Sequence, residues 1–328
     1  MVWLIIALVG FGWLAVRFDL LSMARILVRF SRLGAPAEIR LQPLSRPAWR
    51  HAGRVEALLG ELRGLDFEEG PHFRVLEIPG MTLQLLFHHE ERVYAAIYEA
   101  PLVGTILDFD THYADGTSVT YTTSKEGIGQ EDPPGRRKVR LPGLSAAELF
   151  HRLVRDRPLG EIPPLDTRRV QELVQRDYAD EMLWRSSRGG PTAAEILAMA
   201  EAQGRSYPAE VVAQSRKVQF EQAMRSLNTT LRKRLPGGGD SAGPVLMADA
   251  QLVYIHDDLT PELLSELVGR LTGTEVAPES PGAGPARQLF PILNSRLPQE
   301  RRFRKVGELQ EPLPGDVYAL PGVTPGTR

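Results

Sequence analysis

The stretch that decides the fold is residues 73–123, FRVLEIPGMTLQLLFHHEERVYAAIYEAPLVGTILDFDTHYADGTSVTYTT. Five segments within it are rich in β-branched, aromatic or aliphatic residues, as strands are. These segments are Phe73–Ile78, Thr82–His88, Arg92–Glu99, Thr105–Tyr113 and Thr117–Thr123. The turns between them are short, and short turns force neighbouring strands to be antiparallel. The stretch therefore predicts a five-stranded antiparallel meander.

The end of this stretch and the residues after it add two expectations. Asp115–Gly116 predicts a type I′ hairpin turn, because both residues tolerate positive φ. Lys138–Leu141 is a candidate sixth strand after a long loop.

Helices are predicted on both sides of the meander. Ala48–Arg63 carries an apolar stripe, and Ser145 and Thr192 each stand three residues before a glutamate, which is the capping-box spacing. Further helices are expected over 166–185, 208–235 and 260–271, with a strand at 251–256. The last forty residues predict short strands at most. The fold class is therefore α+β.

These patterns divide the chain into six parts. They are a membrane anchor with a basic amphipathic helix (1–34), a proline-containing linker (35–47), a meander domain (48–160), a helical segment (161–235), a glycine-rich linker (236–244) and a small C-terminal α/β portion with an irregular tail (245–328).

The first residues predict a single membrane span. Val2–Val16 contains no charged residue, and the helix can continue past Arg17, whose long side chain reaches the interface. A cleaved secretory signal carries basic residues before its apolar run, and none is present here. We therefore expect an uncleaved anchor, with a cleaved signal or a buried core helix as the alternatives.

Arginines set the expected orientation of this anchor. Arg17, Arg25, Arg29 and Arg32 all follow the apolar run, and positive charge marks the cytoplasmic side. The bulk of the chain is therefore expected in the cytoplasm. The four arginines share one side of a helix, which suits an anionic leaflet surface; packing of this helix on the protein's own core is the alternative.

Composition narrows the function classes. The 328-residue chain has no cysteine, which excludes disulfides, thiolate metal sites and a cysteine nucleophile. Its formal net charge of −2 argues against a whole-surface nucleic-acid partner. The sequence patterns of the common nucleotide loops, serine hydrolases, zinc proteases and EF-hands do not occur, and no cofactor is predicted, although a divalent metal is possible.

The sharpest polar pattern is Asp108, Asp110 and His112. Alternate residues of a strand share a face, so two carboxylates and an imidazole would line up and could hold a divalent ion. The competing interpretation is the solvated face of a half-buried strand. Two other polar groups, His256–Asp258 and Arg301–Lys305, are interpreted as residues at a helix start and as surface charge.

The function expected from these patterns is that of a membrane-anchored, cytoplasm-facing binding or scaffold protein with an unknown protein partner. One alternative is a metal-assisted hydrolase or lyase that uses Asp108, Asp110 and His112. Another is a small-ligand or lipid carrier with an apolar cavity between the meander and the helix at 48–63.

Overall fold

The computed structural model describes residues 35–100, 104–235, 250–278, 284–307, 309 and 313–320. The chain divides into two compact units. Unit 1 contains the described residues up to Lys125 together with Gly135–Arg176, and unit 2 contains Glu126–Pro134 and the described residues from Asp177 onward. The chain therefore leaves unit 1 for nine residues, returns, and leaves it again within a helix.

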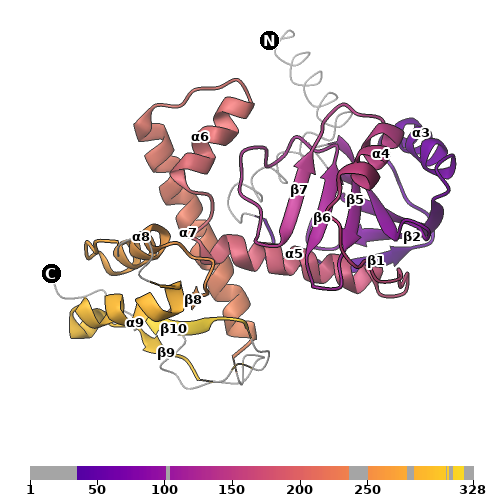
Figure 1. The fold of residues 1–328 in the computed structure, drawn as a ribbon. Coiled ribbons are helices and arrows are strands. Elements are labelled where there is room, and N and C mark those ends of the chain that lie inside the picture. Colours follow the sequence, from indigo (N-terminus) through magenta and orange to yellow (C-terminus); the bar gives the residue numbers. More distant parts are fainter. Residues whose placement is uncertain are drawn as a thin grey trace, which may run out of the picture. The chain divides into compact units, whose positions relative to one another are not determined.

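Unit 1 is built on a seven-stranded sheet whose strands lie in sequence order, β1 to β7 (Figure 1). Its elements are β1 (Leu41–Leu44), α3 (Ala52–Arg63), β2 (Glu68–Val75), β3 (Thr82–His88), β4 (Val93–Ala100), β5 (Gly104–His112), β6 (Ser118–Thr122), β7 (Arg136–Arg140) and α4 (Ala146–Asp156). Strands β2 to β6 form the predicted antiparallel meander. The α+β fold class is confirmed.

One edge of the sheet differs from the prediction, and the other carries the predicted further strand as β7. Residues 35–47 were predicted to be a linker, yet β1 lies within them and pairs with β2. The prolines misled the prediction: Pro43 pairs opposite Phe73 in an edge strand, where a missing N–H is tolerated. At the other edge, β7 runs parallel to β6, because the long segment between them lets the chain return to the same end of the sheet.

The β5–β6 connection is also not the predicted type I′ turn. Gly116 has a φ of +86°, but Asp115 is not among the residues with positive φ. The Gly116 N–H donates to the Tyr113 carbonyl (3.0 Å) and the Tyr113 N–H to the Thr117 carbonyl (2.9 Å). This pattern is that of a turn followed by one left-handed glycine, the next most common way to close a hairpin.

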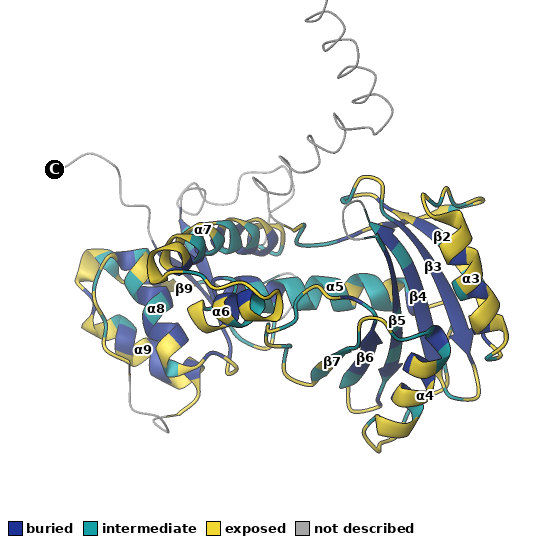
Figure 2. Cartoon of the chain, turned by 90° about the horizontal axis from the view of Figure 1, so that it is seen from above, coloured by how far each residue is buried: buried dark blue, intermediate teal, exposed yellow. Residues whose placement is uncertain are grey.

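Helices α3 and α4 cover one face of the sheet, as the view in Figure 2 shows. Val55 and Leu62 of α3, Leu149 of α4, and Leu107 and Phe109 of β5 belong to one buried cluster. Since side chains alternate along a strand, Asp108, which stands between Leu107 and Phe109, points to the opposite face.

Unit 2 consists of helices and a small three-stranded sheet. Its elements are α5 (Val170–Ser187, which begins in unit 1), α6 (Ala193–Ala202), α7 (Ala209–Lys233), β8 (Gln251–Ile255), α8 (Pro261–Thr272), α9 (Ala286–Arg296), the 3₁₀ turn η2 (Gln299–Arg301), β9 (Arg304–Lys305) and β10 (Asp316–Leu320). The sheet is antiparallel in the order β8-β10-β9. A separate buried cluster, which includes Leu227, Leu264 and Phe290, forms the core of this unit.

Local sequence signals for helix starts are confirmed. Ser145 and Thr192 both form complete capping boxes with their glutamates, and the Thr260 side chain accepts a hydrogen bond from Leu263 N–H at the start of α8. Helix α9 was not predicted, because Pro291 stands inside it and proline disfavours a helix interior.

The predicted anchor (1–34) and glycine-rich linker (236–244) lie outside the described residues. Among the helices of the described part, none combines the length and the apolarity that a membrane crossing requires.

Candidate functional site

The three residues predicted as a metal site lie on a half-buried polar face of the sheet of unit 1 that we call the polar ladder. Leu107 and Phe109 of β5 face the core, so Asp108, Asp110 and His112 point to the opposite face. The register with β6 and β7 continues this face in three rows of like composition, each with an acid or imidazole, a hydroxyl and a base. The rows are Asp108–Thr122–Arg140, Asp110–Thr120–Lys138 and His112–Ser118–Arg136.

Each of the three predicted residues contacts a different neighbour. Asp108 Oδ2 accepts a hydrogen bond from the Tyr98 hydroxyl at 3.2 Å. Asp110 Oδ1 accepts one from Thr120 Oγ1 at 2.5 Å. The His112 ring stacks on Tyr94 with 5.8 Å between ring centroids. The structure thus places the residues on one face, as predicted, and each of them contacts a different side chain; Tyr94, on which His112 stacks, lies opposite Asp110 in the register.

These contacts bear on the metal hypothesis without deciding it. Within the part of the chain that the structure describes, no three histidine, aspartate or glutamate side chains converge in a way that could hold a metal ion. The metal role of Asp108, Asp110 and His112 therefore stays a prediction, and we derive no chemical step through a metal.

His112 is neutral in the folded protein at physiological pH. Burial, together with the positive charges of Arg136 and Arg176, lowers the pKa of its imidazole to about 4. The ladder therefore carries an uncharged imidazole beside two carboxylates and three basic side chains.

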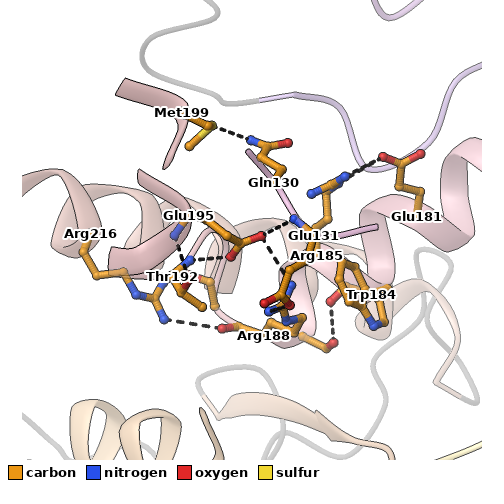
Figure 3. Close-up of polar contacts among 12 residues, drawn as sticks. Gln130, Glu131, Glu181, Trp184, Arg185, Arg188, Thr192, Glu195, Met199 and Arg216 are labelled. Carbon is orange, nitrogen blue, oxygen red and sulfur yellow. Dashed lines mark hydrogen bonds and ion pairs between the residues drawn. The ribbon is translucent and has the colours of Figure 1, made fainter. Parts of the chain in front are cut away.

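A second polar cluster surrounds the carboxyl end of α5 in unit 2 (Figure 3). The buried guanidinium of Arg188 contacts Glu131 and lies 3.6 Å from Glu195 Oε1. Glu195, which is 3% exposed, also accepts hydrogen bonds from the backbone N–H groups of Glu131 (2.9 Å) and Thr192 (2.7 Å). Burial raises the pKa of Glu195, but these donors and Arg188 outweigh it and lower the pKa overall.

This cluster fastens the segment 126–134 to unit 2. Glu131 is held by Arg188 and Glu195, and Gln130 Nε2 donates to the Met199 sulfur (Figure 3). Gly129 has a φ of +89°, and a Cβ there would lie 2.7 Å from the backbone of Ala198. Only glycine fits this approach, because any side chain would overlap the helix.

Arg216 of α7 closes the carboxyl end of α5. Its guanidinium donates to the carbonyls of Gly189 and Arg188, the two residues that directly follow α5. Its Nε donates to Glu266 of α8 at 3.1 Å. Since Arg216 is 3% exposed, this pairing compensates a charge that would otherwise be costly to bury.

The same end of α5 carries a chain of hydrogen bonds that we call the relay, Ser187–His256–Asp258. Ser187 Oγ lies 2.7 Å from His256 Nε2, and His256 Nδ1 lies 3.2 Å from Asp258 Oδ2. Sequence reasoning missed Ser187, because its partner is 69 residues away and no local pattern links the two.

The relay has the order of a hydrolytic triad but the opposite exposure. In such a triad the serine must meet the substrate and the aspartate is buried. Here Ser187 is fully buried, whereas the Asp258 side chain is 45% exposed. The N–H groups of Arg188, Gly189 and Gly190 are also engaged by carbonyls of α5 and are not available to an oxyanion. The geometry therefore describes a structural network.

Other predicted polar groups act at helix ends. Asp257 pairs with Arg287 at the start of α9. Arg301 donates to the Thr272 carbonyl at the end of α8, and Arg302 donates to the Ser295 and Leu297 carbonyls at the end of α9. The arginines predicted to meet the membrane surface (Arg17, Arg25, Arg29 and Arg32) lie outside the described residues.

Comparison with known protein families, curated proteins and solved structures gave no match to this chain. The functional argument therefore rests on geometry and chemistry.

Proposed function

We propose that this protein is a membrane-anchored, cytoplasm-facing binding protein and that the polar ladder of unit 1 is its recognition surface. The observation that carries the proposal is the succession of three rows of like composition across β5, β6 and β7, each with a hydroxyl on β6 and a base on β7. Strands fix side chains more rigidly than loops, so the charges of the ladder are arranged before a partner arrives.

The chemistry of the rows favours a polar protein partner with acidic groups. Each row ends in a base on β7, namely Arg136, Lys138 or Arg140, and arginine recognises carboxylates through paired N–H donors. In two of the rows, a hydroxyl on β6 separates the carboxylate of Asp108 or Asp110 on β5 from the base on β7. The ladder therefore carries charges of both signs, which disfavours partners of uniform charge.

The anchor part of the proposal rests on residues 1–34. The uncharged run Val2–Val16 and the four arginines after it support a span whose carboxyl side is cytoplasmic. A chain that lacks residues 2–16 should leave the membrane fraction. A reporter that is active only in the periplasm, fused at Arg328, should be silent; a strongly active fusion would overturn the orientation.

The ladder is tested with a matched pair of substitutions on one strand. Lys138→Glu reverses a charge of the ladder, whereas Arg137→Glu makes the same change on an exposed neighbour that points to the other face. Proteins cross-linked to the chain in intact membranes are then quantified. We expect losses of tenfold or more specific to Lys138→Glu, since one charge reversal in an interface costs several kcal/mol. Equal losses for both variants would contradict the proposal.

The two alternatives have their own measurements. Titration calorimetry with Mg²⁺, Mn²⁺ and Zn²⁺ against an Asp108→Ala/Asp110→Ala variant tests the metal-assisted enzyme, which needs binding by the parent chain. The carrier hypothesis requires space beneath α3, where Val55, Leu59 and Leu62 pack into the core cluster. We therefore favour the binding protein over the carrier.

A further inference from the structure

A buried histidine in unit 2 belongs to a chain of three polar contacts, and a neutral imidazole has too few N–H donors to complete all three. His256 is 5% exposed and stacks on Tyr254 with 5.0 Å between ring centroids. Its Nε2 lies 2.7 Å from Ser187 Oγ, and its Nδ1 lies 3.2 Å from Asp258 Oδ2. Ser187 Oγ also lies 2.7 Å from the Trp184 carbonyl oxygen.

Counting protons along this chain shows the excess. The Trp184 carbonyl and the Asp258 carboxylate are acceptors only, so each must receive a proton from its neighbour. If the Ser187 hydroxyl donates to Trp184, then Nε2 must donate to Ser187. Nδ1 must also donate to Asp258, and a ring with both nitrogens protonated is an imidazolium. The three contacts are complete only when His256 is charged.

A neutral ring must give up one contact, and the geometry indicates which. The Asp258 contact is the longest of the three and its side chain is 45% exposed, so water can replace the imidazole at little cost. Ser187 is fully buried, so water cannot take over either of the two contacts that its hydroxyl makes, with the Trp184 carbonyl and with Nε2. The neutral ring should therefore carry its proton on Nε2, hold Ser187 and release Asp258.

We propose that His256 is a proton-operated latch: its protonation draws Asp258 onto the ring and tightens the turn that leads from β8 into α8. The turn is short, because Leu259 N–H already donates to the His256 carbonyl (3.2 Å) and Thr260 caps α8. Proton uptake at one buried ring would thus be communicated to the start of a helix. This device acts in unit 2 and does not depend on the proposed function.

Charged groups from several elements face the ring and set when the latch operates. Burial is the largest influence and lowers the pKa of His256, and the guanidinium of Arg188 on α5 adds to this. Asp258 and Asp257 raise the pKa, although Asp257 is paired with Arg287 of α9. The net pKa lies below the ordinary value of 6.5, so the latch closes in acid.

Nitrogen-15 NMR of the histidine ring tests the proposal on the solubilised full chain. The protein is labelled on histidine, the His256 signals are assigned by their loss in His256→Gln, and the pH is varied from 8 to 4. We expect an Nε2–H tautomer at high pH and protonation of both nitrogens in acid. Asp258→Asn should lower the midpoint by about one pH unit, since an opposite charge at this distance shifts a pKa by 1–3 units.

Two results would overturn the latch. One is an Nδ1–H tautomer at high pH in the parent chain, because Asp258 would then be held without any proton uptake. The other is an unchanged midpoint in Asp258→Asn. Ser187→Ala provides a further check, since removing the hydroxyl should free Nε2 and favour the Nδ1–H tautomer. The parent spectrum decides the proposal even if this variant does not fold.

Discussion

At the scale of single residues, a buried carboxylate joins a strand to the start of a helix in unit 1. Glu99 of β4 is 2% exposed and accepts hydrogen bonds from the N–H groups of Arg50 (2.5 Å) and His51 (3.0 Å) just before α3. It also contacts His51 Nδ1 at 2.6 Å. A helix start leaves N–H groups without partners, and a strand residue supplies the missing acceptor.

We predict that Glu99→Gln destabilises the protein by about 1–3 kcal/mol, the cost of weakening buried charge-assisted hydrogen bonds. Urea unfolding at pH 7 measures this loss. Glu56→Gln is the matched control, because the Glu56 side chain is 66% exposed and a surface change should stay within about 0.5 kcal/mol. Comparable losses in both variants would show that Glu99 has no special role.

The same carboxylate predicts a pH dependence with a definite sign. Burial raises the pKa of Glu99, but the donors from Arg50 and His51 outweigh it, so the folded pKa lies below the unfolded value of 4.5. Its stabilisation is therefore complete above pH 4.5 and is lost as the pH falls through the depressed pKa. The drop in urea midpoint below pH 4.5 should be smaller in Glu99→Gln than in the parent chain.

His112 predicts a second loss of stability at a higher pH. Its pKa is about 4 in the folded chain and 6.5 unfolded, because burial disfavours the charged ring. Stability should fall as the pH decreases from 6.5 towards 4, since the unfolded chain binds the extra proton. His112→Asn should flatten the urea midpoint across this window. A parent chain with no slope there would contradict the assignment of a neutral imidazole.

At the scale of elements, the sequence predicted the strands and helix starts that depend on neighbouring residues. The meander strands follow from runs of β-branched and aromatic residues, and both capping boxes follow from a hydroxyl three residues before a glutamate. Strand β1 and helix α9 escaped prediction, because Pro43 and Pro291 argue against regular structure while distant partners override them. Pro43 is paired with Phe73, and α9 buries Leu289, Phe290 and Leu293.

The candidate site was predictable to the same extent. The period of a strand placed Asp108, Asp110 and His112 on one face, which the register confirms. The sequence did not predict that the bases of β7 share this face. The parallel register of β7 depends on the segment 126–134, which belongs to unit 2. Ser187 and His256 meet through tertiary packing alone.

The docking of that connection is tested by a glycine pair. We predict that Gly129→Ala destabilises the chain by at least about 1 kcal/mol more than Gly143→Ala, because overlap with packed backbone forces a shift. Both glycines have positive φ (+89° and +92°), but a Cβ at Gly143 meets nothing within 4 Å. Hydrogen exchange should rise over 126–134 only in Gly129→Ala. Equal destabilisation in both variants would mean that the positive φ of Gly129, and not its close approach to Ala198, requires glycine.

At the scale of the whole molecule, the described residues form two buried apolar clusters that share no residue. Leu107 belongs to the cluster of unit 1 and Leu264 to that of unit 2, and both are fully buried leucines. The chain passes between the units through α5 and through the segment 126–134. Stability is therefore expected to be a property of each unit, because an apolar core stabilises the elements that bury it.

A pair of leucine truncations tests this independence. Leu107→Ala and Leu264→Ala should each cost about 2–5 kcal/mol, the range for a buried leucine. Hydrogen exchange resolved by peptide should rise across β4, β5 and β6 in the first variant and across β8, α8 and α9 in the second. If either truncation raised exchange equally in both units, the two cores would unfold as one, which would contradict the independence of the two units.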